Sequence, residues 1–213
     1  HVTTIDTPGA KEHDLQVIVP VEDMTAVGSR IVATELEDLD TPSSNADSYS
    51  IWGALHAELL DHVEAHTSTI LFVNSRRLAE RIATALNELA ARRVLARPVE
   101  AQRERYAAEG IEWTDETEVD VPADLRTPIV ARAHHGSISR ELRTEMEELL
   151  KAGQLPCIVA TSSLELGIDM GAVDLVVQVE SPRSVASGLQ RIGRAGHNVG
   201  DISRGRIYPK HRS

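Results

Sequence analysis

The octapeptide at positions 190–197, Gln-Arg-Ile-Gly-Arg-Ala-Gly-His, holds two arginines, Arg191 and Arg194, three residues apart. On a helix this spacing puts both guanidinium groups on one face. The two glycines have no side chains, so the turn that follows has little bulk. Arginines held in this way stabilise the negative charge that builds on a transferred γ-phosphoryl group. The peptide also fits the end of a surface helix. It is not a GxGxxG sequence, so it predicts no dinucleotide site.

Three further polar clusters contain residue types that bind phosphate. Asn74-Ser75-Arg76 follows an apolar run and precedes a helical pattern, where free backbone amides and the helix dipole favour an anion. His135-Gly136-Ser137 repeats this arrangement, and Thr161-Ser162-Ser163 offers hydroxyls after a third apolar run. Each cluster also has a plainer interpretation as a helix cap or turn with solvated side chains.

Two clusters have side chains suited to ligands other than phosphate. Gly167-Ile168-Asp169 places a carboxylate after a flexible glycine, where it either accepts hydrogen bonds from ribose hydroxyls or forms a turn. The adjacent histidines His134 and His135 have no third ligand at a suitable spacing, so the sequence predicts no metal site.

Alternating strand and helix patterns must position these clusters. Short apolar runs predict buried strands, and apolar residues at spacings of three and four predict helices between them. This alternation predicts an α/β fold with a doubly wound parallel sheet and flanking helices, and the clusters fall at the carboxyl ends of its strands, where such sheets bind ligands. The predicted strands are 69–73, 129–133, 157–161, 175–179 and 206–208; the predicted helical stripes are 51–63, 78–89, 142–149 and 185–192.

The chain divides into two parts by composition. Residues 1–50 contain one extended segment, 14–21, and a polar linker that ends in TPSSNADSYS. Residues 51–213 form the α/β domain. Within it, residues 91–127 lose the hydrophobic period and gather charge, which predicts a peripheral and partly disordered insertion.

Composition limits the classes of protein. The formal net charge of −11 is unusual for a nucleic-acid binder, but the acidic residues crowd 35–40 and 109–124, whereas 182–213 holds several arginines and one acidic residue, Asp201. One cysteine, Cys157, excludes an intrachain disulfide and favours the reducing cytoplasm. No apolar stretch approaches a membrane span. A first residue that is His rather than Met indicates a segment cut from a longer enzyme.

Read together, the clusters resemble the motifs of the second motor domain of superfamily 2 helicases, in their order. TILFVNSRRLAERIA (69–83) resembles motif IV, AHHGSIS (133–139) the segment after it, ATSSLELGIDMGAVDLVV (160–177) motif V, and 190–197 motif VI. The sequences of these segments are most similar to those of the Lhr, or large helicase-related, family. The resemblance covers about residues 51–209 without the insertion. The resemblance implies a RecA-like fold of the P-loop NTPase type. It also implies an ATP-dependent translocase that moves 3′ to 5′ on single-stranded DNA, unwinds duplexes or RNA–DNA hybrids, and serves DNA repair.

The resemblance also assigns residues. Gln190 and Arg194 would face the γ-phosphate of ATP, with Arg194 as the arginine finger and Arg191 as a further catalytic candidate. Gly167 and Asp169 would line the nucleotide's sugar, and His197 stands where most of the superfamily has a second finger arginine. Contacts to the nucleic-acid backbone would come from Asn74, Ser75, Arg76, His135, Gly136, Ser137, Thr161 and Ser162.

Two motifs of a complete motor are missing from the sequence. It contains neither a GxxxxGK[ST] phosphate loop nor a DEAH-like acidic motif for Mg²⁺. Hydrolysis of ATP with Mg²⁺ therefore requires a first RecA-like domain, and accessory domains are expected on the same polypeptide. The alternatives are a degenerate RecA-like module that only binds nucleic acid or protein, and an unrelated α/β enzyme. Intact Gln190, Arg194 and Asp169 favour the motor, because pure binding needs no γ-phosphate ligands.

Overall fold

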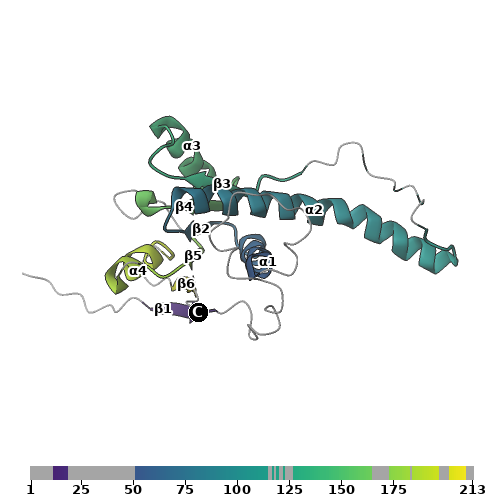
Figure 1. Ribbon diagram of the computed structural model, residues 1–213, viewed down its shortest axis with the longest axis horizontal. Coiled ribbons are helices and arrows are strands. Elements are labelled where there is room, and N and C mark those ends of the chain that lie inside the picture. The colour runs from purple at the N-terminus through teal and green to yellow at the C-terminus, as the bar shows by residue number, and fades with distance from the viewer. Residues whose placement is uncertain are drawn as a thin grey trace, which may run out of the picture.

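The protein folds around one parallel β-sheet. A computed structural model describes residues 12–18, 51–114, 117, 119, 122, 127–164, 173–182, 184–196 and 202–209. The described strands form a six-stranded sheet in the order β1-β6-β5-β2-β4-β3, and every strand pair is parallel (Figure 1). The strands are β1 (His13–Val17), β2 (Thr69–Phe72), β3 (Ala131–His134), β4 (Cys157–Ala160), β5 (Leu175–Val179) and β6 (Ser203–Tyr208). The helices are α1 (Ile51–Glu64), α2 (Arg76–Glu109), α3 (Arg140–Lys151), the 3-10 turn η3 (Ser162–Leu164) and α4 (Val185–Ile192).

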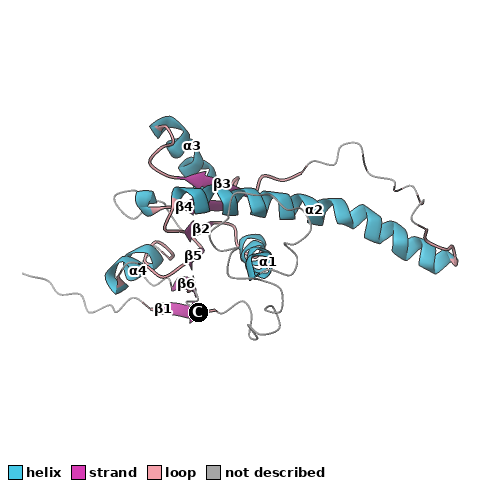
Figure 2. Cartoon of the chain, in the orientation of Figure 1, coloured by secondary structure: helices cyan, strands magenta, loops and turns pink. Residues whose placement is uncertain are grey.

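The predicted α/β fold with a parallel sheet is confirmed. The three central strands β5, β2 and β4 are buried along their whole length, as continuous apolar runs in a parallel sheet require. Helices cover both faces, as Figure 2 shows. Leu71 and Val159 belong to the core formed with α1 and α2, whereas Ile70 and Ile158 belong to the core formed with α3 and α4. Alternate residues of one strand therefore serve opposite layers.

Serine side chains fix where three of the helices begin. Ser75, Ser139 and Ser184 precede α2, α3 and α4, and each side-chain oxygen accepts a backbone amide three residues on, at 3.1–3.3 Å. A glycine follows the end of α3: Gly153 adopts the left-handed region at φ +67. These caps set the helix starts close to the ends of the preceding strands.

Helix α2 departs from the sequence-based prediction. It runs without interruption for 34 residues, through Pro98, to a left-handed Gly110 at φ 70. The predicted helical stripe stops at Leu89, whereas the helix continues through residues 91–109, which we call the arm. The arm is rich in Ala, Arg and Glu, whose helix propensity stabilises a helix without an apolar stripe. Figure 1 shows the arm extending far past the sheet. That 91–127 is an insertion stays a prediction, and most of 115–126 lies outside the described residues.

Close packing at β6 positions helix α4. Gly205 lies in β6, and a Cβ built there would stand 3.0 Å from side-chain atoms of Ile192, the last residue of α4. Glycine at this position therefore lets the end of α4 lie directly on the sheet. The extended segment predicted at 14–21 begins as β1, which pairs with β6, while residues 19–21 lie outside the described residues. Within the described residues no helix is long and apolar enough to cross a lipid bilayer.

Candidate nucleic-acid and nucleotide-binding site

The carboxyl ends of four neighbouring strands form one edge of the sheet, which we call the crevice edge. The chain leaves β2 at Asn74, β3 at His135, β4 at Thr161 and β5 at Glu180. Two hydrogen bonds extend the ladder beyond the strands: Val73 N donates to Ala160 O at 2.9 Å, and Thr161 N donates to His134 O at 3.2 Å. Three of the predicted polar clusters are therefore brought to one edge, the place where ligands bind to open α/β sheets.

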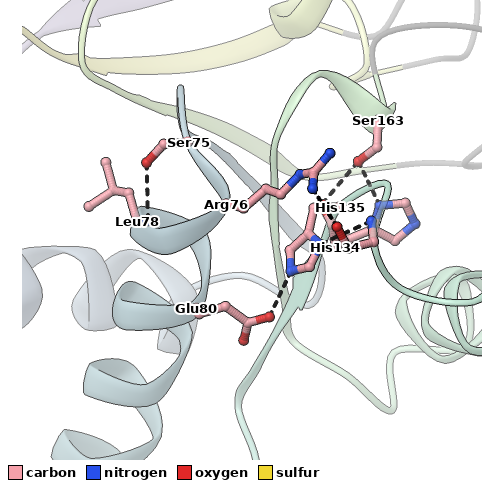
Figure 3. Close-up of polar contacts among 8 residues, drawn as sticks. Ser75, Arg76, Leu78, Glu80, His134, His135 and Ser163 are labelled. Atoms are coloured by element: carbon pink, nitrogen blue, oxygen red, sulfur yellow. Dashed lines mark hydrogen bonds and ion pairs between the residues drawn. The ribbon is translucent and has the colours of Figure 1, made fainter.

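Arg76 and Ser137 connect two of these clusters. Arg76 is exposed in the first turn of α2, and its guanidinium donates a hydrogen bond to Ser137 Oγ, in the loop after β3 (Figure 3). Ser75 Oγ is used as the helix cap. Gly136, beside Ser137, is exposed, and an added Cβ would meet nothing within 4 Å. This part of the crevice edge combines a cation, a hydroxyl and an open backbone, which suits a phosphate chain.

His135 is turned inward and holds this loop. It is 7% exposed; its Nε2 lies 2.7 Å from Glu80 Oε1, and its Nδ1 accepts the amide of Ser137 at 3.3 Å. An accepting Nδ1 leaves the ring proton on Nε2, which then donates to the carboxylate. Both ring nitrogens are engaged within the chain. The His135 side chain therefore holds the turn at Gly136 and Ser137 in place through the Ser137 amide, while its other nitrogen faces Glu80 (Figure 3).

His134 forms a buried polar cluster that the sequence analysis did not assign. The ring is fully buried, with Nδ1 2.9 Å from Ser163 Oγ and Nε2 3.0 Å from Glu147 Oε1. Burial lowers the pKa of His134 and outweighs the opposing effect of Glu147, so the ring is neutral at pH 7. A neutral ring that donates from Nε2 to Glu147 accepts the Ser163 hydroxyl at Nδ1.

This cluster ties η3 to β3 and α3. Ser163 Oγ also lies 3.0 Å from the carbonyl oxygen of His134, so its one proton is shared between two acceptors. The start of the 160–177 motif is thereby fixed, with Thr161 half-buried and Ser162 exposed. A sequence signal existed for Glu147, because it stands beside Met146 and three residues before Leu150 on the buried face of α3.

The two arginines of the 190–197 peptide do not share a face. Helix α4 ends at Ile192 with Gly193 as its cap, so Arg194 lies in the turn beyond. Arg191 is 3% exposed; its NH1 donates to Gln178 Oε1 at 2.6 Å, and its guanidinium lies 5.1 Å from the centre of the Phe72 ring. These contacts give Arg191 a structural role within the domain, and its expected catalytic role stays a prediction. Gln190 is exposed and Arg194 is half-buried.

Comparison with known proteins agrees with this geometry. The model for the helicase conserved C-terminal domain matches residues 111–198. A Mycolicibacterium smegmatis protein named Lhr helicase/probable uracil glycosylase is 47% identical over 99% of this chain and 12% of its own length. The Escherichia coli Lhr helicase/uracil glycosylase is 46% identical over 99% of this chain and 13% of its own. A solved structure of the M. smegmatis helicase Lhr bound to single-stranded DNA and AMP-PNP matches 97% of this chain and 20% of that one, with 48% identity and a TM-score of 0.65.

The chain belongs to the Lhr family of superfamily 2 helicases. Its sheet is the RecA-like fold that the sequence predicts for a second motor domain. It spans about an eighth of the length of the two curated Lhr relatives, so it corresponds to one domain of such a protein.

The Lhr motif residues fall into three groups in the structure. The first group surrounds the crevice edge and comprises Arg76, Gly136, Ser137, Thr161 and Ser162. The second group supports this edge: Ser75 caps α2, and His135 forms a buried hydrogen bond. Asn74 also has a supporting contact, because its Nδ2 donates to Glu180 Oε2 and to Ser181 O, both at 3.1 Å. Gly167, Asp169 and His197 lie outside the described residues.

The described part of this Lhr domain offers no metal site of its own. None of its residues form a group of three or more His, Cys, Asp or Glu side chains that could hold an ion. The pair His134 and Glu147 has a serine as its third member rather than a ligand of Mg²⁺.

Proposed function

We propose that this chain is the second motor domain of an ATP-dependent helicase or translocase that moves 3′ to 5′ along single-stranded DNA in the cytoplasm. The whole enzyme would unwind DNA duplexes or RNA–DNA hybrids and serve DNA repair. The polarity, the hybrid substrate and the repair role follow the family resemblance. A first RecA-like domain and accessory domains on the same polypeptide would complete the motor.

The observation that carries the proposal is the meeting at the crevice edge of three clusters whose residue types suit phosphate. Arg76 begins a helix beside the end of β2 and reaches Ser137 beyond β3, while Thr161 follows β4 between them. A sugar–phosphate backbone laid across these strand ends would meet a guanidinium, two hydroxyls and backbone amides in sequence. Such contacts position a strand without reading its bases. The Lhr relative bound to single-stranded DNA supports this assignment.

The nucleotide would lie at the other end of the same edge, beyond α4. Gln190, at the end of α4, and Arg194, just past it, carry the side chains suited to a γ-phosphate, and Gly167, Asp169 and His197 would complete the contacts. Bound ATP with Mg²⁺ would supply the phosphoryl group; the phosphate loop and the Mg²⁺ ligands belong to the first domain. Arg194 would place its planar guanidinium against the charge that develops in the transition state. The relative solved with AMP-PNP supports a nucleotide partner.

The test is Arg194→Ala in the polypeptide that carries both motor domains. A finger arginine typically contributes about 10³–10⁵ in turnover, and we expect a loss of at least about tenfold in ATP hydrolysis with saturating single strand. Affinity for the single strand without nucleotide should stay almost unchanged. Arg194→Lys should not restore the full rate, because a point charge does not reproduce the planar fork.

Arg92→Ala is the matched control for this test. Arg92 lies on α2 with a side chain that is 75% exposed, about 24 Å along the helix from Arg76 at its usual rise, so its loss should leave hydrolysis unchanged. Hydrolysis near the wild-type rate in Arg194→Ala, or equal losses of hydrolysis and strand affinity, would instead favour a degenerate RecA-like module that only binds nucleic acid.

A further inference from the structure

A buried glutamine interrupts the apolar run of a central strand. Gln178 is 1% exposed, in the sequence Leu-Val-Val-Gln-Val of β5. A buried amide is tolerated where its donors and its acceptor are all satisfied. Gln178 meets this condition: its Oε1 accepts Arg191 NH1 at 2.6 Å, and its Nε2 donates to the carbonyl oxygens of Val179 at 3.2 Å and Glu180 at 2.9 Å.

On one side, Gln178 holds the helix that precedes the proposed γ-phosphate ligands. Phe72 of β2 and Gln178 of β5 are partners in the parallel register, so they stand side by side on one face of the sheet. The guanidinium of Arg191 covers both, through the hydrogen bond to Gln178 and the contact with the Phe72 ring. Gln190 directly precedes Arg191, and Arg194 follows it by three residues, past the Gly193 cap. The contacts of Arg191 with Gln178 and Phe72 therefore fix the position of the last turn of α4 on the sheet.

On the other side, Gln178 holds a strained turn. Glu180 has φ 65, the one positive φ at a non-glycine residue within the described part of the chain. Such a conformation persists where neighbouring groups determine it, and it often marks functional sites. Here the Glu180 amide donates to Tyr208 O at 2.9 Å, and its carbonyl accepts Gln178 Nε2.

The turn at Glu180 also holds Asn74, the first residue after β2 at the crevice edge. Asn74 Nδ2 donates both to the Glu180 carboxylate and to the carbonyl oxygen of Ser181, each at 3.1 Å. Asn74 precedes Ser75, the cap of α2, and Arg76, the proposed strand contact. A continuous series of hydrogen bonds thus runs from Arg191 through Gln178 and Glu180 to Asn74.

We propose that Gln178 is a positioning residue that couples the nucleotide end of the crevice edge to its nucleic-acid end. A shift of α4 on meeting nucleotide would move Arg191, and Gln178 would pass that shift through the Glu180 turn to Asn74 and the start of α2. Energetic coupling of this kind is reciprocal, so bound strand would also set the position of Arg194. This inference rests on the proposed function, because it needs both ligands.

The experiment measures coupling rather than activity. In the polypeptide with both motor domains, the dissociation constant for single-stranded DNA is measured without and with saturating AMP-PNP, and the ratio of the two is the coupling. We expect a wild-type ratio of roughly five- to 150-fold, the usual range for linked sites, and a ratio below about twofold in Gln178→Met. Methionine keeps the length of the side chain but neither accepts from Arg191 nor holds the turn.

Two further variants separate coupling from general damage to the fold. Asn74→Ala removes an exposed side chain at the far end of the series, so it should fold normally and lower the same ratio. Thr69→Val is the buried control, because Thr69 Oγ1 is buried in β2 without a hydrogen-bond partner in the described part of the chain, and its ratio should match wild type. A merely structural role for Gln178 would change both dissociation constants by one factor and leave the ratio intact.

The outcomes distinguish this inference from the proposed function. A wild-type ratio in both Gln178→Met and Asn74→Ala overturns the inference, and so does a ratio of one in the unaltered enzyme. Neither result touches the proposed function, which the hydrolysis of Arg194→Ala decides. An unaltered enzyme that binds neither DNA nor AMP-PNP would overturn the proposed function and the inference with it.

Discussion

The crevice edge and the arm of α2 use charged and polar residues in opposite ways. At the crevice edge, His134, Gln178 and Arg191 are buried and satisfied by contacts with residues distant in the sequence, such as Ser163 and Phe72. On the arm, Arg93 forms ion pairs with Asp61 and Glu64 of α1, each at 2.7 Å, close to where the arm begins. Other polar contacts of the arm are local: Arg92 lies 4.0 Å from Glu88, one turn away, and Arg103 lies over the Trp113 ring at 5.3 Å.

This difference shows which polar residues the fold itself requires. Beyond Arg93, the arm is a helix because its residues favour one locally, and its exposed polar side chains are replaceable by other helix formers. The polar residues of the crevice edge depend on partners in other elements, so replacing one leaves a buried group without its partner.

The sharpest way to break the comparison uses two leucines of the same helix. Leu86 is fully buried against the sheet, whereas Leu95, on the arm, is 45% exposed. Leu86→Ala should lower the free energy of unfolding by about 2–5 kcal/mol, because it removes apolar contacts and leaves a cavity. Leu95→Ala should change it by no more than about 0.5 kcal/mol. Urea unfolding of this chain measures both.

The helix propensity of the new residue is the same in both variants, so each serves as the control for the other. A loss at Leu95 as large as that at Leu86 would contradict the description of the arm as an extension whose apolar side chains add little to the core. It would mean instead that the arm packs against this chain beyond the ion pairs of Arg93 with Asp61 and Glu64.

Much of the fold follows from local pattern. Buried central strands in a parallel sheet are continuous apolar runs, so β2, β4 and β5 are evident from 69–73, 157–161 and 175–179. Serine before a helical stripe predicts a cap, and Ser75 and Ser139 are caps. The arm was missed because an exposed helix needs no hydrophobic period, so the loss of that period after residue 90 does not indicate a loop.

The polar partners could not be found from pattern alone. The arginine spacing in 190–197 places both side chains on one face only if the helix continues, and α4 ends between them. Asn74 and Glu180 are 106 residues apart, and nothing in either segment marks the other as its partner. Gln178 was the available signal, since one amide in an apolar strand requires buried partners. Its register with Phe72 becomes clear only from the sheet.

A smaller effect is expected where the same helix meets the proposed strand. Arg76→Ala, in the polypeptide with both motor domains, should weaken single-strand binding by roughly 1–3 kcal/mol, as for a charge-assisted hydrogen bond. The salt dependence of binding should also flatten by about one counterion. Thr161→Ala should weaken binding without changing that slope, because a hydroxyl carries no charge. The measurement is a binding titration over a range of salt concentrations.

Arg92→Ala is the control from the arm, since it removes the same charge from the same helix at an exposed position. It should leave both the affinity and its salt dependence unaltered. If Arg92→Ala weakened binding as much as Arg76→Ala, the strand would contact the arm, and the functional contrast between the two regions would fail. Unaltered affinity in both Arg76→Ala and Thr161→Ala would refute the assignment of the crevice edge to nucleic acid.

The smallest expected effect is a pH dependence of the free energy of unfolding. It should come from the residues around the sheet and not from the arm, because residues 91–114 contain no histidine. Burial lowers the pKa of His134 below its ordinary 6.5, so the unfolded chain binds more protons than the native one as pH falls below that value. The free energy of unfolding should therefore be highest above pH 6.5 and should decrease as the pH falls from 6.5 to the lower pKa of His134 in the folded protein. Burial acts in the same direction on the pKa of His62, which lies 2.8 Å from Tyr208 Oη. His134→Asn should reduce the difference in unfolding free energy between about pH 7.5 and about pH 5.5. The part of that difference that comes from His62 should remain. Urea unfolding at the two pH values measures the difference. A variant that kept the full wild-type difference would show that the buried cluster of His134, Glu147 and Ser163 does not resist protonation.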